Sequence, residues 1–226
     1  EVGNENARET RKELLRHVDD EEIEPAKLET LWETRIAIPG RSQAEDARYE
    51  LVEANDVQAS HLPEAGFQKN PAYGLENERR YHDEPASQAK VLRNAADLNP
   101  DFLLRDSVDA NNGAPVIDQD NNVLGGNGRA MSVRMAYQAG GKKSEEYRAA
   151  LKKRARELGI NPEKVDSMKR PMLVRRIASA YSKQERQELI SSLNDTFTDT
   201  KNTRMAGKSR GDRLGKRSLS MLAEGL

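Results

Sequence analysis

The sequence contains no cysteine, which excludes disulfide bonds, cysteine–zinc sites and a thiol nucleophile. Aromatic residues are scarce at 4%, and hydrophobic residues, at 35%, barely outnumber charged residues, at 33%. This balance predicts a modest core with extended polar helices around it. No apolar run approaches membrane-spanning length and no signal peptide is visible, so we expect a soluble cytoplasmic protein that does not enter a membrane. Because the first residue is Glu1 and not methionine, we expect a fragment or a processed chain.

The formal net charge of −1 conceals an uneven distribution of charge along the chain. Residues 1–30 hold ten acidic and five basic side chains. Residues 142–176 hold twelve basic and five acidic ones, and residues 201–226 hold seven basic and two acidic ones. Basic segments favour phosphate backbones, which makes DNA a candidate partner. The alternative is that each segment is simply the solvated face of a helix.

Hydrophobic periodicity and turn residues place helices and strands along most of the chain. Polar helices are expected up to Trp32, after which Ile36-Ala37-Ile38-Pro39-Gly40 interrupts the pattern. The elements expected after that are a strand over 49–57, a loop over 58–77, helices from Pro85 and Pro100, strands at 116–117 and 123–124, helices over 130–138 and from Ser144 to Leu158, a strand over 172–174 flanked by Arg170, Arg175 and Arg176, and helices from Ser182 onward.

The segment from Ala114 to Arg129 is the most informative part of the sequence. It predicts a strand hairpin, then residues Gly125–Arg129, called here the glycine bend, and then a helix. Glycines before a helix N-terminus let bare backbone N–H groups approach an anion, and the helix dipole and Arg129 add positive potential. These features are those of a phosphate site. The alternative is a glycine turn that only lets the helix pack on the sheet.

This segment resembles the ParB/sulfiredoxin superfamily, in which a strand hairpin ends in a glycine–arginine motif that opens a helix. The branch it resembles is the DdrB-like one, known from large multi-domain proteins of phages and conjugative elements. Its pattern appears as Gly113-Ala114-Pro115-Val116 and Gly126-Asn127-Gly128-Arg129, with further blocks at Ala59-Ser60-His61, Asn70-Pro71-Ala72-Tyr73 and Glu78-Arg79-Arg80-Tyr81. The resemblance covers roughly residues 48–210.

The resemblance implies an α/β (α+β) fold with a small mixed sheet. We expect a helical arm over residues 1–47, a ParB-like core over 48–180 with a helical insertion at 140–168, and a helical extension over 181–226. It also implies a nucleoside triphosphate, CTP or ATP, bound with Mg²⁺ at the glycine bend. The absence of cysteine excludes the sulfiredoxin chemistry of the wider superfamily.

The same resemblance assigns roles to individual residues. Gly126, Asn127 and Gly128 offer backbone donors to phosphate, Arg129 a charge, and Arg79 or Arg80 a second clamp. Asn194 is the implied magnesium ligand, although the glutamate that often precedes it is Leu193 here. His61 is a candidate for binding or catalysis, because histidine titrates near neutrality and can hydrogen-bond phosphate.

Two other patterns give weaker evidence for a functional site. Gly207-Lys208-Ser209 resembles the end of a Walker A loop, but Asn202 replaces the first glycine and no strand precedes it. A basic turn between helices is the better interpretation. The only other histidines, His17 and His82, do not have the spacing of a zinc site.

We therefore expect a nucleotide-dependent, DNA-associated protein of a phage or other mobile element. It would act in the cytoplasm of a bacterial host or be packaged with a phage, as a homodimer or fused to other domains. Slow hydrolysis of CTP or ATP and a ParB-like nuclease activity are both open. The competing hypothesis is a non-catalytic protein-interaction module of a larger protein. The missing glutamate before Asn194 favours this module, and the intact Gly-Asn-Gly-Arg run opposes it.

Overall fold

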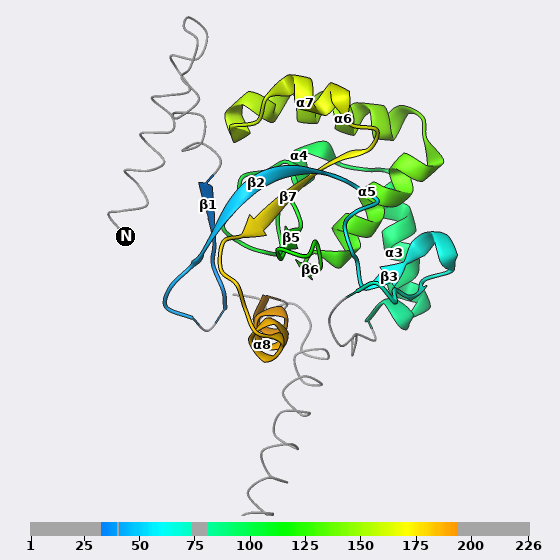
Figure 1. Ribbon diagram of the computed structural model, residues 1–226. Coiled ribbons are helices and arrows are strands. Elements are labelled where there is room, and N and C mark those ends of the chain that lie inside the picture. The colour runs from blue at the N-terminus through cyan, green and yellow to red at the C-terminus, as the bar shows by residue number, and fades with distance from the viewer. Residues whose placement is uncertain (1–32, 40, 74–80, 194–226) are drawn as a thin grey trace, which may run out of the picture.

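A computed structural model describes residues 33–39, 41–73 and 81–193, and its centre is a sheet of five strands (Figure 1). The strands are β1 (Glu33–Ile36), β2 (Glu45–Glu53), β5 (Val116–Ile117), β6 (Val123–Gly125) and β7 (Pro171–Ile177), in the spatial order β1-β2-β7-β5-β6. β5 and β7 pair in parallel and the other neighbours are antiparallel. The small mixed sheet predicted from the sequence is therefore confirmed.

Helices and one further hairpin surround this sheet. The short strands β3 (His61–Leu62) and β4 (Gln68–Lys69) pair with each other. The helices are α3 (Pro85–Ala96), α4 (Pro100–Leu103), α5 (Asn127–Ala139), α6 (Lys142–Ala155), α7 (Pro162–Ser167) and α8 (Lys183–Leu193), with single 3₁₀ turns η1 (Pro63–Ala65), η2 (Tyr81–Asp83) and η3 (Arg156–Leu158). Within the described ranges, no helix has the length and apolar character of a membrane span.

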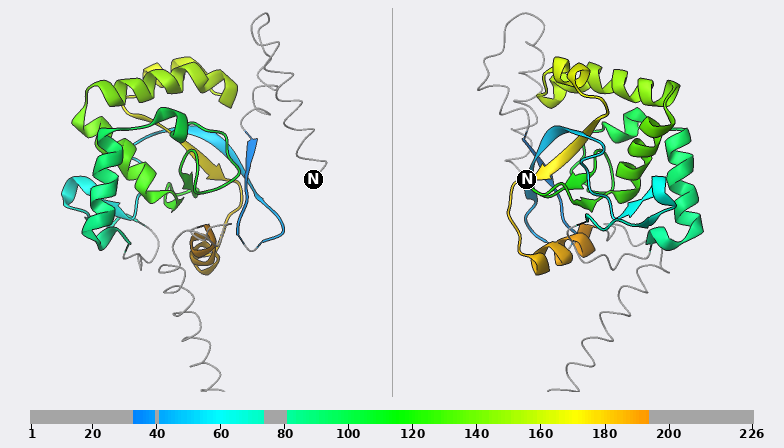
Figure 2. Two further views of the ribbon diagram at one scale, coloured as in Figure 1. Left: turned by 180° about the vertical axis from the view of Figure 1, so that it is seen from behind. Right: turned by 45° about the vertical axis from the view of Figure 1, so that its right-hand side comes forward.

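The two faces of the sheet bury separate hydrophobic clusters. Successive side chains of a strand point to opposite faces. Ile117 and Val123 accordingly join a large cluster with α3, α5 and α6, whereas Val116 and Leu124 join a smaller one with Leu189 and Leu193 of α8. Figures 1 and 2 show α6 and α7 on one side of the sheet and α8 on the other. The β5–β6 hairpin is thus buried on both sides, directly before the glycine bend.

The structure differs from the sequence prediction in three local elements. Residues 33–36 form the edge strand β1, which was not expected, and Ala37 continues it by donating its N–H to Val108 O. The predicted 58–77 loop contains the β3–β4 hairpin. Ser144 does not cap α6: the helix begins after Gly141, and the Ser144 hydroxyl donates to the Gly141 carbonyl one turn back.

The largest local error concerns the arginines around β7. Arg175 and Arg176 were expected to flank a three-residue strand, but β7 runs through both of them and buries both. Arg176 donates to Glu50 on β2, to Asp118 O and to Asn121, so its charge is compensated across the sheet. A pair of arginines is typical of exposed positions. Here the long aliphatic stems lie in the sheet, and the charged ends find oxygen acceptors at its rim.

Candidate functional site

The hairpin turn that precedes the glycine bend is fixed by one buried carboxylate. Oδ1 of Asp118 accepts the backbone N–H groups of Asp120 and Asn122, the local pattern that makes aspartate a turn former. Asn121 takes a left-handed φ of 65°, which asparagine tolerates. Arg186 of α8 bonds to Asp118 Oδ2 at 3.1 Å. The turn is therefore held both by its own residues and by the C-terminal helix.

Gly126 occupies the position that starts helix α5, and its conformation requires glycine. Its φ is 85°, and its carbonyl oxygen accepts the N–H groups of Arg129 and Ala130. A Cβ atom at this position would lie 2.5 Å from Nη2 of Arg129. The backbone of Gly126 therefore lies directly against the guanidinium group of Arg129. Any side chain at this position would push the two apart.

Helix α5 begins with Asn127 and Gly128. Their backbone N–H groups and the Asn127 side chain face different parts of the protein. The first N–H groups of a helix have no acceptor within it, and they face whatever lies beyond the helix end. The Asn127 side chain points inward instead, where Oδ1 accepts the N–H of Ser60 at 2.7 Å. The helix start thus offers backbone donors, while the asparagine side chain joins the bend to the Ser60-His61 block.

Arg129 lies beneath the bend, and its side chain is partly buried. Its guanidinium donates to Gly113 O at 2.6 Å and to Ala110 O. Burial, and secondarily the nearby Arg175, lowers the pKa of Arg129 to about 9. The side chain is therefore still a cation at neutral pH, and it supplies charge at the helix start from the inner side.

Arg175 is a second cation in the same place, and its complete burial was not recognised from the sequence. It is 0% exposed, and all five of its hydrogen bonds go to backbone carbonyls of Ser107, Asp109, Asn112 and Ala114. Burial lowers its pKa, an effect that Tyr49, Asp109 and Asp106 oppose from nearby. The two guanidinium groups hydrogen-bond to the carbonyl groups of the loop before β5, residues 107–114. Together they concentrate positive charge below the start of α5.

A chain of polar groups lies on the other side of the bend. Ser60 Oγ is 2.9 Å from Nδ1 of His61, and Nε2 of His61 is 3.0 Å from Oδ1 of Asp83. Ser60 and His61 are completely buried, whereas the Asp83 side chain is 46% exposed. The His82 ring packs edge-on against His61 and lies 3.8 Å from where a Cβ of Gly128 would be. Folding thus brings His61 to the bend, as the sequence suggested, and adds Asp83 and His82.

Three predicted site residues lie outside the described residues: Arg79, Arg80 and Asn194. Some described residues near them in the sequence lie close to the β5–β6 hairpin or the bend. Tyr73 donates its hydroxyl to Val123 O in β6, and His82 lies 3.8 Å from where a Cβ of Gly128 would be. Leu193, the last residue of α8, packs 3.7 Å from where a Cβ of Gly125 would be.

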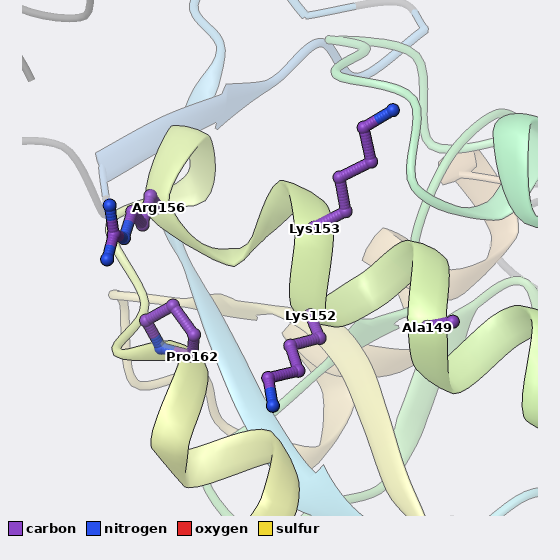
Figure 3. Close-up of a pocket in the computed structure, with 5 residues that line it drawn as sticks. All are labelled: Ala149, Lys152, Lys153, Arg156 and Pro162. Carbon is purple, nitrogen blue, oxygen red and sulfur yellow. The ribbon is translucent and has the colours of Figure 1, made fainter. Parts of the chain in front are cut away.

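The basic segment 142–176 does not form one continuous cationic face. Eight of its twelve basic side chains bond to partners within the protein: Lys142, Lys143, Arg148, Lys152, Arg154, Arg170, Arg175 and Arg176. Lys152, Lys153 and Arg156 line a shallow depression of about 500 Å³ together with Ala149 and Pro162, and their charged ends point in different directions (Figure 3).

Comparison with known proteins identifies one family. The model of the ddrB-like ParB superfamily domain matches residues 40–178, which is more than half of the chain and includes the hairpin, the glycine bend and both buried arginines. No curated protein and no solved structure gives a significant match. On its fold and on this match, the chain belongs to the ddrB-like ParB superfamily.

Proposed function

We propose that the glycine bend binds the phosphate groups of a nucleoside triphosphate, CTP or ATP. The observation that carries this proposal is a pair of cations below the start of α5, the partly buried Arg129 and the fully buried Arg175. Their hydrogen bonds among the described residues go to neutral carbonyl oxygens. Taking a cation out of water is costly, and neutral acceptors recover only part of that cost. A phosphate on the outer side of the bend would recover more, because attraction is strong where water is excluded.

The start of α5 supplies the matching donors. Helix N-termini bind phosphate through free N–H groups and the positive end of the helix dipole. At the bend, the missing Cβ of Gly126 lets the guanidinium of Arg129 lie close beneath the backbone that carries those groups. Magnesium fits such a site, because the ion keeps several waters and needs only one or two protein oxygens besides the phosphates. Within the described ranges, no three His, Asp or Glu side chains cluster as a metal cage.

The first prediction is that nucleotide raises the melting temperature of the full chain. Ligand at 100 times its Kd stabilises a folded protein by about 2.7 kcal/mol, which corresponds to about 5–10 °C for a protein of this size. Differential scanning fluorimetry with the four nucleoside triphosphates and Mg²⁺, and with pyrophosphate alone, measures this. No shift with any of them would contradict the proposal and support the competing protein-interaction module.

Asn127→Asp tests whether the bend itself is the site. The substitution keeps the oxygen that accepts from Ser60 N–H and adds a negative charge at the helix start. We expect at least about a tenfold loss of phosphate affinity by calorimetry, because like charges a few ångströms apart repel by several kcal/mol at intermediate dielectric. Asn161→Asp is the matched control, since Asn161 caps α7 through the same kind of side-chain oxygen. Equal affinities in both variants would place the phosphate elsewhere.

DNA association is a separate proposal with weaker support from the described residues. Eight of the twelve cations of segment 142–176 are already bonded within the protein. Of the four others, all exposed, Lys153 and Arg156 lie together on α6 and η3, whereas Lys164 and Lys169 lie further along the chain. We expect weak, sequence-independent binding that falls steeply with salt, and a smaller salt slope in the Lys153→Ala, Arg156→Ala double variant. Gel shifts over a salt series measure both. No binding at low salt with nucleotide and Mg²⁺ present would exclude a DNA role for this chain alone.

A further inference from the structure

The carboxylate of Asp83 is held in a fixed orientation by buried groups. An ionised carboxylate only accepts hydrogen bonds, so Nε2 of His61 donates to Asp83, and in the neutral imidazole Nδ1 accepts from the Ser60 hydroxyl. Ser60 is in turn tied to the start of α5 through its N–H and Asn127. The chain of hydrogen bonds therefore runs from the buried side of the glycine bend out to a carboxylate that is 46% exposed.

The negative charge of Asp83 bears on any anion bound at the glycine bend. One imidazole ring separates Asp83 from Ser60, whose backbone bonds to Asn127. The neighbouring His82 lies 3.8 Å from where a Cβ of Gly128 would be. A polyphosphate seated on the start of α5 would extend toward a carboxylate of the same sign, and the two would repel. A divalent cation between them turns this repulsion into attraction. Carboxylate and phosphate oxygens are the ligands that magnesium prefers.

We propose that Asp83 is the protein ligand of a divalent cation that accompanies the phosphate bound at the glycine bend, and that His61 is the residue that positions it. This inference rests on the proposed function. His61 itself does not bind the metal, because both of its ring nitrogens are engaged. A carboxylate that ligates a metal is commonly fixed by an outer hydrogen bond, and loss of such a bond typically weakens metal binding 10–100-fold.

The experiment measures the affinity of the full chain for pyrophosphate by calorimetry, with and without Mg²⁺. In the unmodified chain we expect Mg²⁺ to tighten pyrophosphate binding. In Asp83→Asn we expect pyrophosphate alone to bind as well or better, because the repelling charge is gone, and the enhancement by Mg²⁺ to fall about tenfold or more. His61→Gln should lose most of the enhancement too, since the carboxylate is no longer oriented.

Glu84→Gln is the control, because Glu84 is the next residue, is exposed and carries the same charge. Its enhancement by Mg²⁺ should be unchanged. The proposal is overturned if Mg²⁺ leaves the affinity of the unmodified chain unaltered, if Asp83→Asn keeps the enhancement, or if Glu84→Gln loses it equally. Failure of pyrophosphate to bind under either condition is a different result, because it contradicts the phosphate site itself.

Discussion

Gly126→Ala should destabilise the protein far more than an ordinary glycine substitution in a left-handed turn. A non-glycine residue in this conformation costs about 1–2 kcal/mol. The new methyl group would also lie within 2.5–2.8 Å of three guanidinium atoms of Arg129 and displace them from their carbonyl partners. Hydrogen bonds to a charged group contribute about 1.5–3 kcal/mol each. We therefore expect a loss of about 3–5 kcal/mol in the free energy of unfolding, measured by urea denaturation.

Two controls separate backbone strain from the clash with Arg129. Gly66 has a similar φ of 69°, but a Cβ there meets nothing within 4 Å, so Gly66→Ala reports strain alone. In an Arg129→Ala background the obstacle is absent, and Gly126→Ala should then cost about as much as Gly66→Ala. The double-mutant cycle should give a coupling of about 2 kcal/mol, in the upper part of the range for residues in contact. Additive effects would mean that the guanidinium is not packed against the bend.

Arg175→Met should destabilise the protein by about 3 kcal/mol or more. Methionine fills a similar volume, but the carbonyl groups of Ser107, Asn112 and Ala114 lose their donor. Each buried acceptor without a partner costs about 1–3 kcal/mol. Removing the buried charge recovers some desolvation energy, yet three or four lost acceptors outweigh that gain. The free energy of unfolding from urea denaturation measures the sum.

The matched control for Arg175 is Arg170→Met, at the residue directly before the same strand. Arg170 is only partly buried and makes one side-chain hydrogen bond to Asn55, so its loss should cost less than about 1 kcal/mol. Hydrogen exchange in the 107–114 loop should accelerate in Arg175→Met and not in Arg170→Met. Equal stability of the two variants would show that Arg175 does not organise this loop.

The parts of the fold that the sequence predicted correctly are those that depend on neighbouring residues. The hairpin and bend follow from Asp118, whose side chain bonds two and four residues ahead, and from Gly126, which alone permits the left-handed start of α5. Pro85 and Asn99 likewise mark helix starts through local chemistry: Pro85 is the first residue of α3, and Oδ1 of Asn99 accepts from Phe102 N–H.

The parts that escaped prediction depend on distant partners. β1 is only four residues long. It exists because it pairs with β2, and because Ala37, the next residue, donates its N–H to Val108 O. The burial of Arg175 depends on carbonyl groups more than 60 residues earlier, which no local pattern reveals. In the candidate site, the Ser60-His61 block was placed correctly near the bend. The contribution of Asp83 was missed because 22 residues separate it from His61.

Helix α8 has a consequence for where the folding unit ends. The family match stops at residue 178, before α8 begins at Lys183. Leu189 and Leu193 nevertheless cover the apolar face that holds Val116 and Leu124. A fragment cut at the family boundary would leave that face in contact with water, and an uncovered apolar surface of this kind favours self-association. The unit defined by sequence relationship is therefore shorter than the unit that buries both faces of the sheet, and any excised version of this domain should retain the chain through Leu193.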